Sequence, residues 1–334
     1  MGVDFLWGDA GRTVVFRQDG YAGAPAVLVE NGFSRFELLS TQRALAATPA
    51  LAEAADAVHE VGPGQVPDLA APLLELARSD RLVALGGGRV IDTAKALASV
   101  TGARVAALPT TMSGAEMTAI HRLPAGAESR AKGMVRPSLV LAEPVAMTSA
   151  PEPDLRASSM NALAHGADSL YTPFANPLAE IAALRGAELI STSLDQQRDA
   201  RNQPSLALGS LLCGYAIDSA RFGLHHVICQ TLVRLCGTPH AQTNATILPL
   251  AVSFLAPRSP TQFAFLAEAL STDPDGLAPR IRQLGGNSPG LGDLGADRTN
   301  LPDAIEAMLQ RPELTYVPTP PSHDELAELL ASAW

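Results

Sequence analysis

The sequence predicts two domains, a Rossmann-like α/β domain over residues 1–150 and an all-helical domain over residues 151–334. In the first half, short strand-like runs alternate with Ala/Leu-rich helical patterns, which is typical of a doubly wound parallel sheet. Over residues 155–310 the strand signals nearly vanish and helical periodicity takes over. A proline-rich segment at residues 144–153 separates the two patterns and marks the predicted boundary.

Composition limits the classes of protein to be considered. With 334 residues, 47% hydrophobic and 17% charged, the chain can bury a large core, and two domains are expected. No window reaches the roughly eighteen apolar residues of a membrane span, and the start lacks a secretory signal, so we expect a soluble, cytoplasmic protein. A net charge of −10 argues against a nucleic-acid partner. Three cysteines lie in apolar helix-like sequence and are expected to be reduced core residues: Cys213, Cys229 and Cys236.

The elements of the first half follow from local patterns. Strands are predicted at residues 13–16, 26–30, 58–61, 81–85, 103–108 and 138–141. Helices are predicted at residues 42–55, with a break at Pro49, at residues 69–78, and after the glycine run that follows the fourth strand. Strands that alternate with helices in this way form parallel sheets.

A run of three glycines lies between a predicted strand and a predicted helix, in the sequence GGGRVIDTAK at residues 86–95. Glycines let the backbone approach a phosphate, and a helix N-terminus supplies unpaired N–H groups and a positive dipole end. The candidate phosphate-binding residues are Gly86, Gly87, Gly88 and Arg89, whose guanidinium can add a forked donor. Asp92 either belongs to this site or is a favourable helix-start residue, and the glycines would also suit a simple tight turn.

A second polar segment, PTTMSGAE at residues 109–116, follows the next predicted strand. The hydroxyls of Thr110, Thr111 and Ser113 can donate to phosphate or ribose oxygens. Alternatively, Ser113 and Glu116 have the spacing of a capping box and could begin a helix. Both interpretations remain open from the residues alone.

Four of the seven histidines lie in helix-like segments of the second half: His165, His225, His226 and His240. Asn161 and His165 are four residues apart, hence on one helix face, with Asp168 a turn further along. The sequence GTPH at residues 237–240 interrupts a helical pattern and could fold the chain back on itself. A single histidine is commonly a satisfied core or surface residue, but this grouping favours proton transfer or carboxylate binding.

In this order, the motifs resemble those of the iron-containing alcohol dehydrogenase superfamily, and most closely its maleylacetate reductase branch. The resemblance includes SMNALAHGADSLY at residues 159–171 and GLHHVIC at residues 223–229, and it covers nearly the whole chain. It implies a dehydroquinate synthase-like architecture with the site in the cleft between the domains. It also implies NADH or NADPH as the cofactor, a small and carboxylated substrate, and a homodimer.

Carried over by position, the glycine run would hold the cofactor pyrophosphate, and Thr110, Thr111 and Ser113 would line the nicotinamide–ribose side. Lys132 resembles a lysine that reaches the cofactor phosphates. Glu30, at the end of an early predicted strand, could accept from the adenosine ribose diol and favour NAD over NADP.

The resemblance also bears on metal binding. Metal-dependent members carry an aspartate at the position of Asn161, together with histidines at the positions of His165, His226 and His240. A neutral amide is a poor ligand, and Asn161 matches the metal-independent branch, so no metal is expected, although three imidazoles could hold zinc. Gln230 occupies a position where both branches commonly carry a histidine near the reacting carbon, and glutamine cannot donate a proton at pH 7.

These observations favour an NAD(P)H-dependent reductase of a small oxo- or enoyl-acid. His226, His240 and His165 would stabilise negative charge and supply a proton, and His225 could substitute for the donor lost at Gln230. The alternative is a recruited non-redox enzyme of small-molecule biosynthesis, such as a dehydratase, decarboxylase, isomerase or cyclase. A ligand-binding protein without activity is a third interpretation, because a fold does not determine a function.

Overall fold

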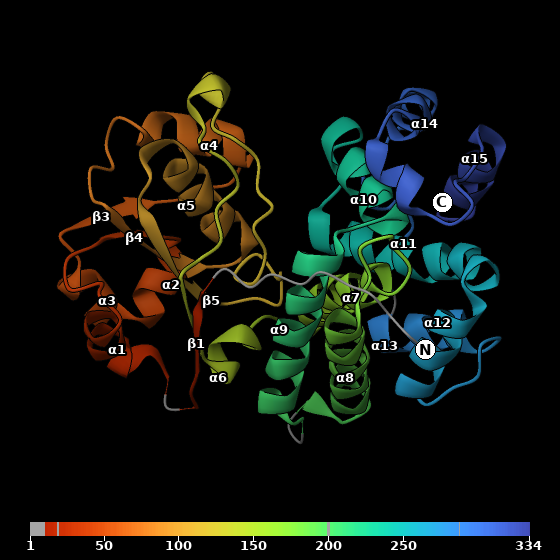
Figure 1. Cartoon of the computed structure of the whole chain (residues 1–334), viewed down its shortest axis with the longest axis horizontal. Helices are drawn as coiled ribbons and strands as arrows, with labels where there is room; N and C mark the ends of the chain where they lie inside the picture. Colours follow the sequence, from red (N-terminus) through yellow and green to blue (C-terminus); the bar gives the residue numbers. More distant parts are fainter. Residues whose placement is uncertain (1–10, 19, 199–200, 287) are drawn as a thin grey trace. The chain divides into compact units, whose positions relative to one another are not determined.

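The computed structural model describes residues 11–18, 20–198, 201–286 and 288–334, and the chain divides into two compact units between Ser149 and Ala150. The unit that precedes this point combines strands and helices, whereas the unit that follows it is built from helices (Figure 1). The predicted combination of an α/β architecture with an all-helical one is therefore confirmed.

A six-stranded sheet with the strand order β1-β6-β5-β4-β2-β3 forms the centre of the first unit, and all of its neighbouring pairs are parallel. The strands are β1 (Thr13–Phe16), β2 (Glu37–Ser40), β3 (Ala57–Glu60), β4 (Arg81–Gly86), β5 (Arg104–Pro109) and β6 (Leu139–Ala142). From β2 the chain first builds outward to β3 and then continues on the opposite side with β4. Ligands of doubly wound sheets bind at the carboxyl ends of strands near such a reversal, which here includes the end of β4.

Helices cover both faces of this sheet. They are α1 (Ala24–Glu30), α2 (Gln42–Ala47), α3 (Pro49–Ala54), α4 (Val66–Leu73), α5 (Gly88–Thr101) and α6 (Pro144–Met147). Alternate residues of β4 point to opposite sides: Leu82 packs in a core cluster with α4 and α5, and Val83 packs in a second cluster with α1. Both faces are buried, which explains why β4 reads as a continuous apolar run.

One element prediction in this unit is wrong, and one strand was not predicted. Residues 26–30, predicted as a strand, form most of helix α1, because Pro25 suits the first helical turn and Ala24, Val27 and Leu28 form one buried face. Glu30 is therefore an exposed residue at the end of a helix. The strand in this region is β2, whose four residues are all buried and so show no alternation of polar and apolar side chains.

One boundary and one local alternative also differ from the prediction. Helix α4 begins at Val66 rather than residue 69, with Pro67 in its first turn. Residues 114–117 form turns instead of a helix, so Ser113 does not cap a helix and the capping-box alternative is wrong. The remaining predicted strands of this unit match observed strands to within about two residues, a normal uncertainty for element ends.

The second unit contains α7 (Glu152–Ser169), α8 (Pro177–Leu194), α9 (Gln203–Ala220), α10 (Leu224–Leu235), α11 (His240–Leu255), α12 (Pro260–Ala269), α13 (Leu277–Gly285), α14 (Leu301–Leu309) and α15 (His323–Ala331). Helix α7 packs against α8, α9, α10 and α11. Small residues allow close packing: a Cβ on Gly186 would lie 2.6 Å from Cys213 Sγ. The break predicted at residues 237–240 separates α10 from α11, and Gly223 lies between α9 and α10.

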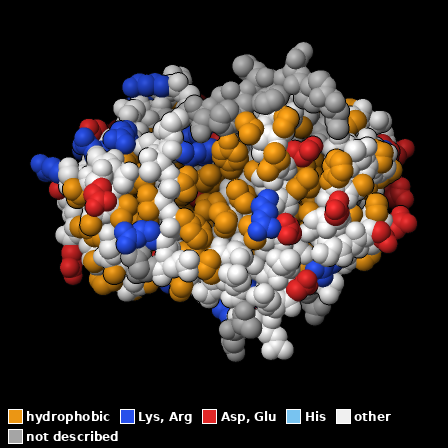
Figure 2. Space-filling view, turned by 60° about the horizontal axis from the view of Figure 1, so that its bottom comes forward, with side chains coloured by type: hydrophobic (Ala, Val, Ile, Leu, Met, Phe, Trp, Pro, Cys, Tyr) orange, Lys and Arg blue, Asp and Glu red, His pale blue; other side chains and the backbone are white. Residues whose placement is uncertain are grey.

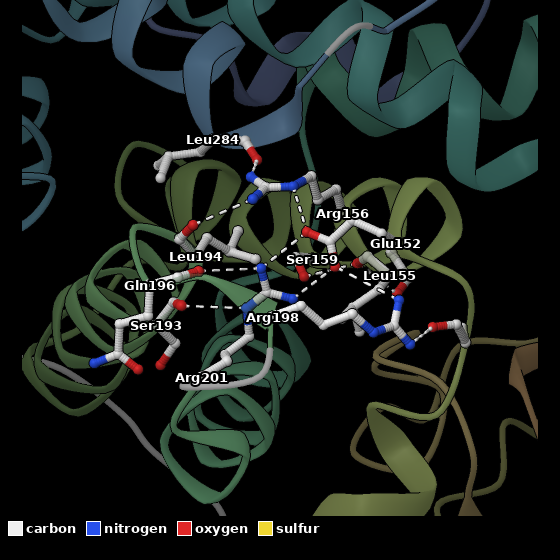
Figure 3. A network of polar contacts seen from close by, with 12 residues as sticks. Glu152, Leu155, Arg156, Ser159, Ser193, Leu194, Gln196, Arg198, Arg201 and Leu284 are labelled. Atoms are coloured by element: carbon white, nitrogen blue, oxygen red, sulfur yellow. Dashed lines mark hydrogen bonds and ion pairs between the residues drawn. The ribbon is translucent and has the colours of Figure 1, made fainter.

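An arginine cluster holds the start of α7 in place (Figure 3). Both oxygens of Glu152 accept forked hydrogen bonds from Arg201, each 2.8 Å long, and Arg156 Nε donates to Oε1 at 2.7 Å. Arg156 also reaches the carbonyl of Leu284, at the end of α13, at 2.7 Å. The cluster fixes the helix whose later turns carry Asn161 and the first of the histidines.

Candidate active site

Helices α7 and α10 bring three of the predicted histidines together. The rings of His165 on α7 and His226 on α10 are stacked, with centroids 4.8 Å apart and planes at 13°. His225 meets His226 edge-on, with centroids 5.0 Å apart, and all three side chains are buried. His240 is the exposed first residue of α11, and its charge acts on His165.

Asp168 organises this cluster, although the sequence gives it no assigned role. Its Oδ2 accepts hydrogen bonds from His226 Nδ1 at 2.7 Å and from the backbone N–H of Gly223 at 3.0 Å and of His226 at 3.3 Å. Its Oδ1 accepts from the Tyr171 hydroxyl at 2.6 Å, which in turn accepts from Leu224 N at 2.7 Å. Gly223 is the N-cap of α10 and has no side chain that could cap the helix. The Asp168 carboxylate instead accepts from backbone N–H groups at the start of α10, where the positive end of the helix dipole favours a negative charge.

The bond to Asp168 determines the proton arrangement of His226. When Nδ1 carries the proton that it donates to Asp168, the lone pair of the neutral ring lies on Nε2. Nε2 is buried and has no hydrogen-bond partner among the described residues. An imidazole with a fixed tautomer and a free nitrogen can exchange a proton with a bound molecule.

Burial controls the charges in the cluster. It is the main reason why the pKa of His165 is well below its usual value, and His226, His240 and His225 lower it further. Burial also lowers the pKa of His225 to about 3, so both rings are neutral at pH 7. For Asp168, burial is the largest influence and raises the pKa, but the interactions with His226, His225 and Tyr171 together outweigh it and bring the pKa to about 2. The carboxylate is therefore ionised and can stabilise a positive charge on His226.

His225 is held separately from the Asp168 network. Its Nε2 lies 2.8 Å from Asn244 Oδ1, and Asn244 Nδ2 donates to the carbonyl of His240 at 2.7 Å. The asparagine oxygen must therefore accept, so His225 Nε2 carries the proton. This neutral, anchored ring stabilises the packing of α10 on α11, and it is less suited than His226 to deliver a proton.

Gln230 lies one turn after His226 on α10, as predicted, and its amide oxygen is engaged. Arg311 Nη2 donates to Gln230 Oε1 at 3.1 Å. The same guanidinium forms a fork with both oxygens of Glu313, at 2.9 and 3.1 Å. Arg311, which is 81 positions away in the sequence, is a neighbour that the sequence did not reveal.

In the first unit, the glycine run forms the turn between β4 and α5. Gly87 is the N-cap of α5, and no side chain caps this helix start. A Cβ on Gly87 would lie 3.0 Å from Thr111 Oγ1, and one on Gly88 would lie 3.0 Å from Ser113 Cβ. The segment after β5 therefore packs directly on the glycines, at a helix start of the kind whose backbone N–H groups can bind a phosphate.

Lys95 connects the start of α5 with the segment after β5, and the sequence did not indicate it as a site residue. Its side chain is fully buried, and Nζ donates to Asp92 Oδ1 at 2.8 Å and to the carbonyls of Ala115 at 3.0 Å and Ile120 at 2.7 Å. The three-residue spacing of Asp92 and Lys95 on a helix could have indicated this ion pair. Asp92 thus supports the loop through Lys95, whereas Arg89 is exposed in the first turn of α5.

The structure places Lys132 away from the glycine turn. Its backbone N–H bonds to the carbonyl of Ser99 at 2.8 Å, and its Nζ would lie 3.4 Å from a Cβ on Gly102. These contacts are at the end of α5, about 20 Å along the helix from its start. This placement does not support the expectation that Lys132 reaches phosphates held at the glycine turn.

Comparison with known proteins identifies the family of this chain. Residues 156–334 match the C-terminal domain of the Fe-containing alcohol dehydrogenase family, and residues 25–121 match a second model described as iron-containing alcohol dehydrogenase. The chain belongs to the Fe-containing alcohol dehydrogenase family. As a member of this family it is an NAD(P)H-dependent oxidoreductase.

Several relatives in the family are named maleylacetate reductase. Maleylacetate reductase 1 of Rhodococcus opacus is 33% identical over 280 residues, which are 81% of this chain and 78% of the relative. The maleylacetate reductase of Pseudomonas aeruginosa is 29% identical over 323 residues, 92% of each chain. The crystal structure of maleylacetate reductase from Agrobacterium tumefaciens superimposes with a TM-score of 0.86 at 27% identity, covering 99% of this chain and 98% of that one.

The family name implies iron, but the side chains of this family member do not form a suitable donor set. Among the described residues, no three His, Cys, Asp or Glu side chains are grouped so that they could hold one ion. The near-parallel, stacked rings of His165 and His226 direct their lone pairs along separate planes rather than toward one point. Asn161 is buried on the same helix as His165, and its neutral amide does not supply the negative charge of a carboxylate ligand.

Lysine and arginine side chains are scattered over the face drawn in Figure 2. In the described part of the chain, no helix is both long enough and apolar enough to cross a membrane.

Proposed function

We propose that this oxidoreductase reduces a small oxo- or enoyl-carboxylic acid, of the kind handled by maleylacetate reductases, without a metal ion. The observation that carries the proposal is the Asp168–His226 pair, which leaves one buried imidazole nitrogen without a partner. The relatives named maleylacetate reductase support the substrate class.

When bound, NADH or NADPH supplies a hydride. Addition of a hydride to an unsaturated oxo-acid leaves negative charge on the substrate, and a proton must follow to complete the reduction. His226 is the residue we assign to deliver that proton from Nε2, since the ionised Asp168 stabilises the positive ring that precedes the transfer. His165, His225 and His240 shape the surroundings as hydrogen-bonding or polar groups, and Asn161 lies on the same helix as His165.

The cofactor site we propose is the cradle at the start of α5. It excludes Lys132 and Glu30 and includes Asp92 only through its bond to Lys95. The residues assigned to hold the nucleotide are Gly86, Gly87, Gly88, Arg89, Thr110, Thr111 and Ser113. Thr110 is fixed in the cradle by its backbone N–H, which bonds to the carbonyl of Gly86 at 2.9 Å.

The test begins with purified protein analysed for metal by mass spectrometry and then titrated with NADH and NADPH, followed by nicotinamide fluorescence. We expect saturable binding and maleylacetate-dependent oxidation of the cofactor that a chelator does not reduce. His226→Asn should lower kcat about 10²–10⁴-fold with unchanged cofactor affinity. The control is His323→Asn, at a half-exposed surface position.

Two outcomes would overturn the proposal. Failure of folded protein to bind either nucleotide would remove the reductase function. Substrate consumption without a change in cofactor absorbance would instead support the non-redox alternative, in which the histidines serve only as acid and base. Loss of activity with removal of a bound metal would contradict metal independence alone.

The proposal also includes a homodimer and a cytoplasmic location, both of which rest on the resemblance of the sequence to maleylacetate reductases and on its composition. Light scattering of the purified protein tests the first. Fractionation of cells that express the full chain tests the second.

A further inference from the structure

We infer that Arg311 forms a binding subsite for a carboxylate of the substrate, with Gln230 as the residue that holds its guanidinium near His226. The inference rests on the proposed function, which already calls for a carboxylated substrate. It adds the group that recognises this substrate.

The position of Arg311 comes from two elements. It precedes the short helix at Pro312–Tyr316. Its Nε and Nη2 donate hydrogen bonds to the two oxygens of Glu313, which belongs to that helix. Its Nη2 also donates to Gln230 Oε1 at 3.1 Å. Gln230 is four residues after His226 on α10 and therefore lies one turn along the same helix face.

Phe222 connects the guanidinium with the histidine cluster. The Arg311 Cζ atom lies 5.8 Å from the centroid of the Phe222 ring, and the same ring lies 6.0 Å from the ring of His226. The positive group and the candidate proton donor thus flank one apolar ring. This arrangement suits a small molecule whose charged end is a few bonds from its reacting carbon.

One edge of the Arg311 guanidinium is available to bind a ligand. Glu313 occupies the edge formed by Nε and Nη2, while the edge formed by Nη1 and Nη2 meets only the neutral oxygen of Gln230. Within the described part of the chain, Nη1 has no hydrogen-bond partner. A carboxylate that replaced the amide oxygen would gain two parallel, charge-assisted bonds, which is the geometry that arginine favours.

The local charge and exposure allow an anion to bind. The Arg311 side chain is 21% exposed, so it is accessible but sheltered from full solvent screening. A second arginine, Arg221, reaches the same short helix at the Tyr316 hydroxyl, 3.5 Å away. Arg221 thus adds a second positive charge beside this short helix.

Gln230 has a specific part in this subsite. A carboxylate in its place would form a lasting ion pair with Arg311, whereas a neutral amide oxygen is more easily displaced by a charged ligand. Gln230 is thus a positioning residue rather than the lost proton donor that the sequence suggested. It keeps the guanidinium directed toward α10 until substrate arrives.

The experiment compares Arg311→Gln with the wild-type protein, using maleylacetate and NADH. We expect KM for maleylacetate to rise about ten- to hundredfold, the loss of a charge-assisted bond pair, with a smaller change in kcat. The dissociation constant for NADH should stay within about twofold. The matched control is Arg258→Gln, because Arg258 also pairs with a glutamate, Glu325, and stacks on a phenylalanine, but on other helices.

A second measurement separates this inference from the proposed function. The inert dicarboxylate hexanedioate is titrated calorimetrically into the wild type, Arg311→Gln and Arg311→Lys, the last serving if the first does not fold. If the wild type reduces maleylacetate and the variants keep its KM, the subsite is refuted while the proposed function stands. If the wild type reduces nothing but binds hexanedioate, and the variants lose that binding, the proposed function fails and the subsite is supported.

Discussion

Replacing Asp168 with asparagine tests the central claim about the histidine cluster. Asp168→Asn keeps the size of the side chain and one oxygen acceptor but removes the negative charge. That oxygen cannot accept from both His226 Nδ1 and the Tyr171 hydroxyl, since these bond to different oxygens of the carboxylate. If the new amide N–H faces His226, the ring must move its proton to Nε2, and the free lone pair is lost.

The structure allows both effects to be estimated. The pKa of Asp168 falls from 3.8 to about 2 in the folded protein, so its charge stabilises the fold above pH 4, and this stability is lost as the pH falls toward 2. The shift corresponds to about 2 kcal/mol at neutral pH, which we expect the asparagine variant to lose. For catalysis, a misplaced proton donor should lower kcat about 10²–10⁴-fold.

The assays are urea unfolding at pH 7, followed by circular dichroism, and the pH profile of kcat with maleylacetate and NADH. The matched control is Asp154→Asn on the same helix, where the carboxylate accepts from Gln242 at an exposed position. A variant Asp168→Asn with wild-type kcat and an unchanged pH profile would refute the role of Asp168 in positioning His226. A loss of stability alone would show that the carboxylate serves only as the cap of α10.

Three further predictions concern other parts of the chain. Gly88→Ala would place a Cβ 3.0 Å from Ser113 Cβ and should weaken NADH binding about tenfold, measured by fluorescence titration. The control Gly62→Ala, whose Cβ would have nothing within 4 Å, should leave the affinity unchanged. Equal affinities of the two variants would contradict the proposed cofactor site at the start of α5. Arg201→Met should lower the free energy of unfolding in urea by about 1–3 kcal/mol, and the exposed Arg185→Met by less than about 1 kcal/mol. Burial raises the pKa of Glu116 from 4.5 to about 7, so stability should decline as the pH rises between these values, and Glu116→Gln should flatten that decline in pH-dependent melting; an unchanged slope would show that this carboxyl is not responsible.

Much of the α/β unit could be predicted because its signals are local. The buried run of β4, the glycines after it and the start of α5 are adjacent in the sequence, so their physical requirements are met by neighbouring residues. Local signals alone give the wrong element for the segment that forms α1. Its Val and Leu residues suit a strand, and only burial of one helical face against the sheet decides for a helix.

The sequence by itself determined the two-unit plan, the glycine turn and the presence of histidines near a break in the helices. The tertiary structure alone decided which groups act together. Asp168 meets His226 because α7 packs against α10, 58 positions further along the chain, and Arg311 reaches Gln230 across 81 positions. The periodicity of a helical sequence indicates which face of the helix is buried, but not which other segment of the chain that face packs against. Proton positions and charges in a site depend on such contacts between distant segments, because burial and hydrogen bonding set the pKa of each group.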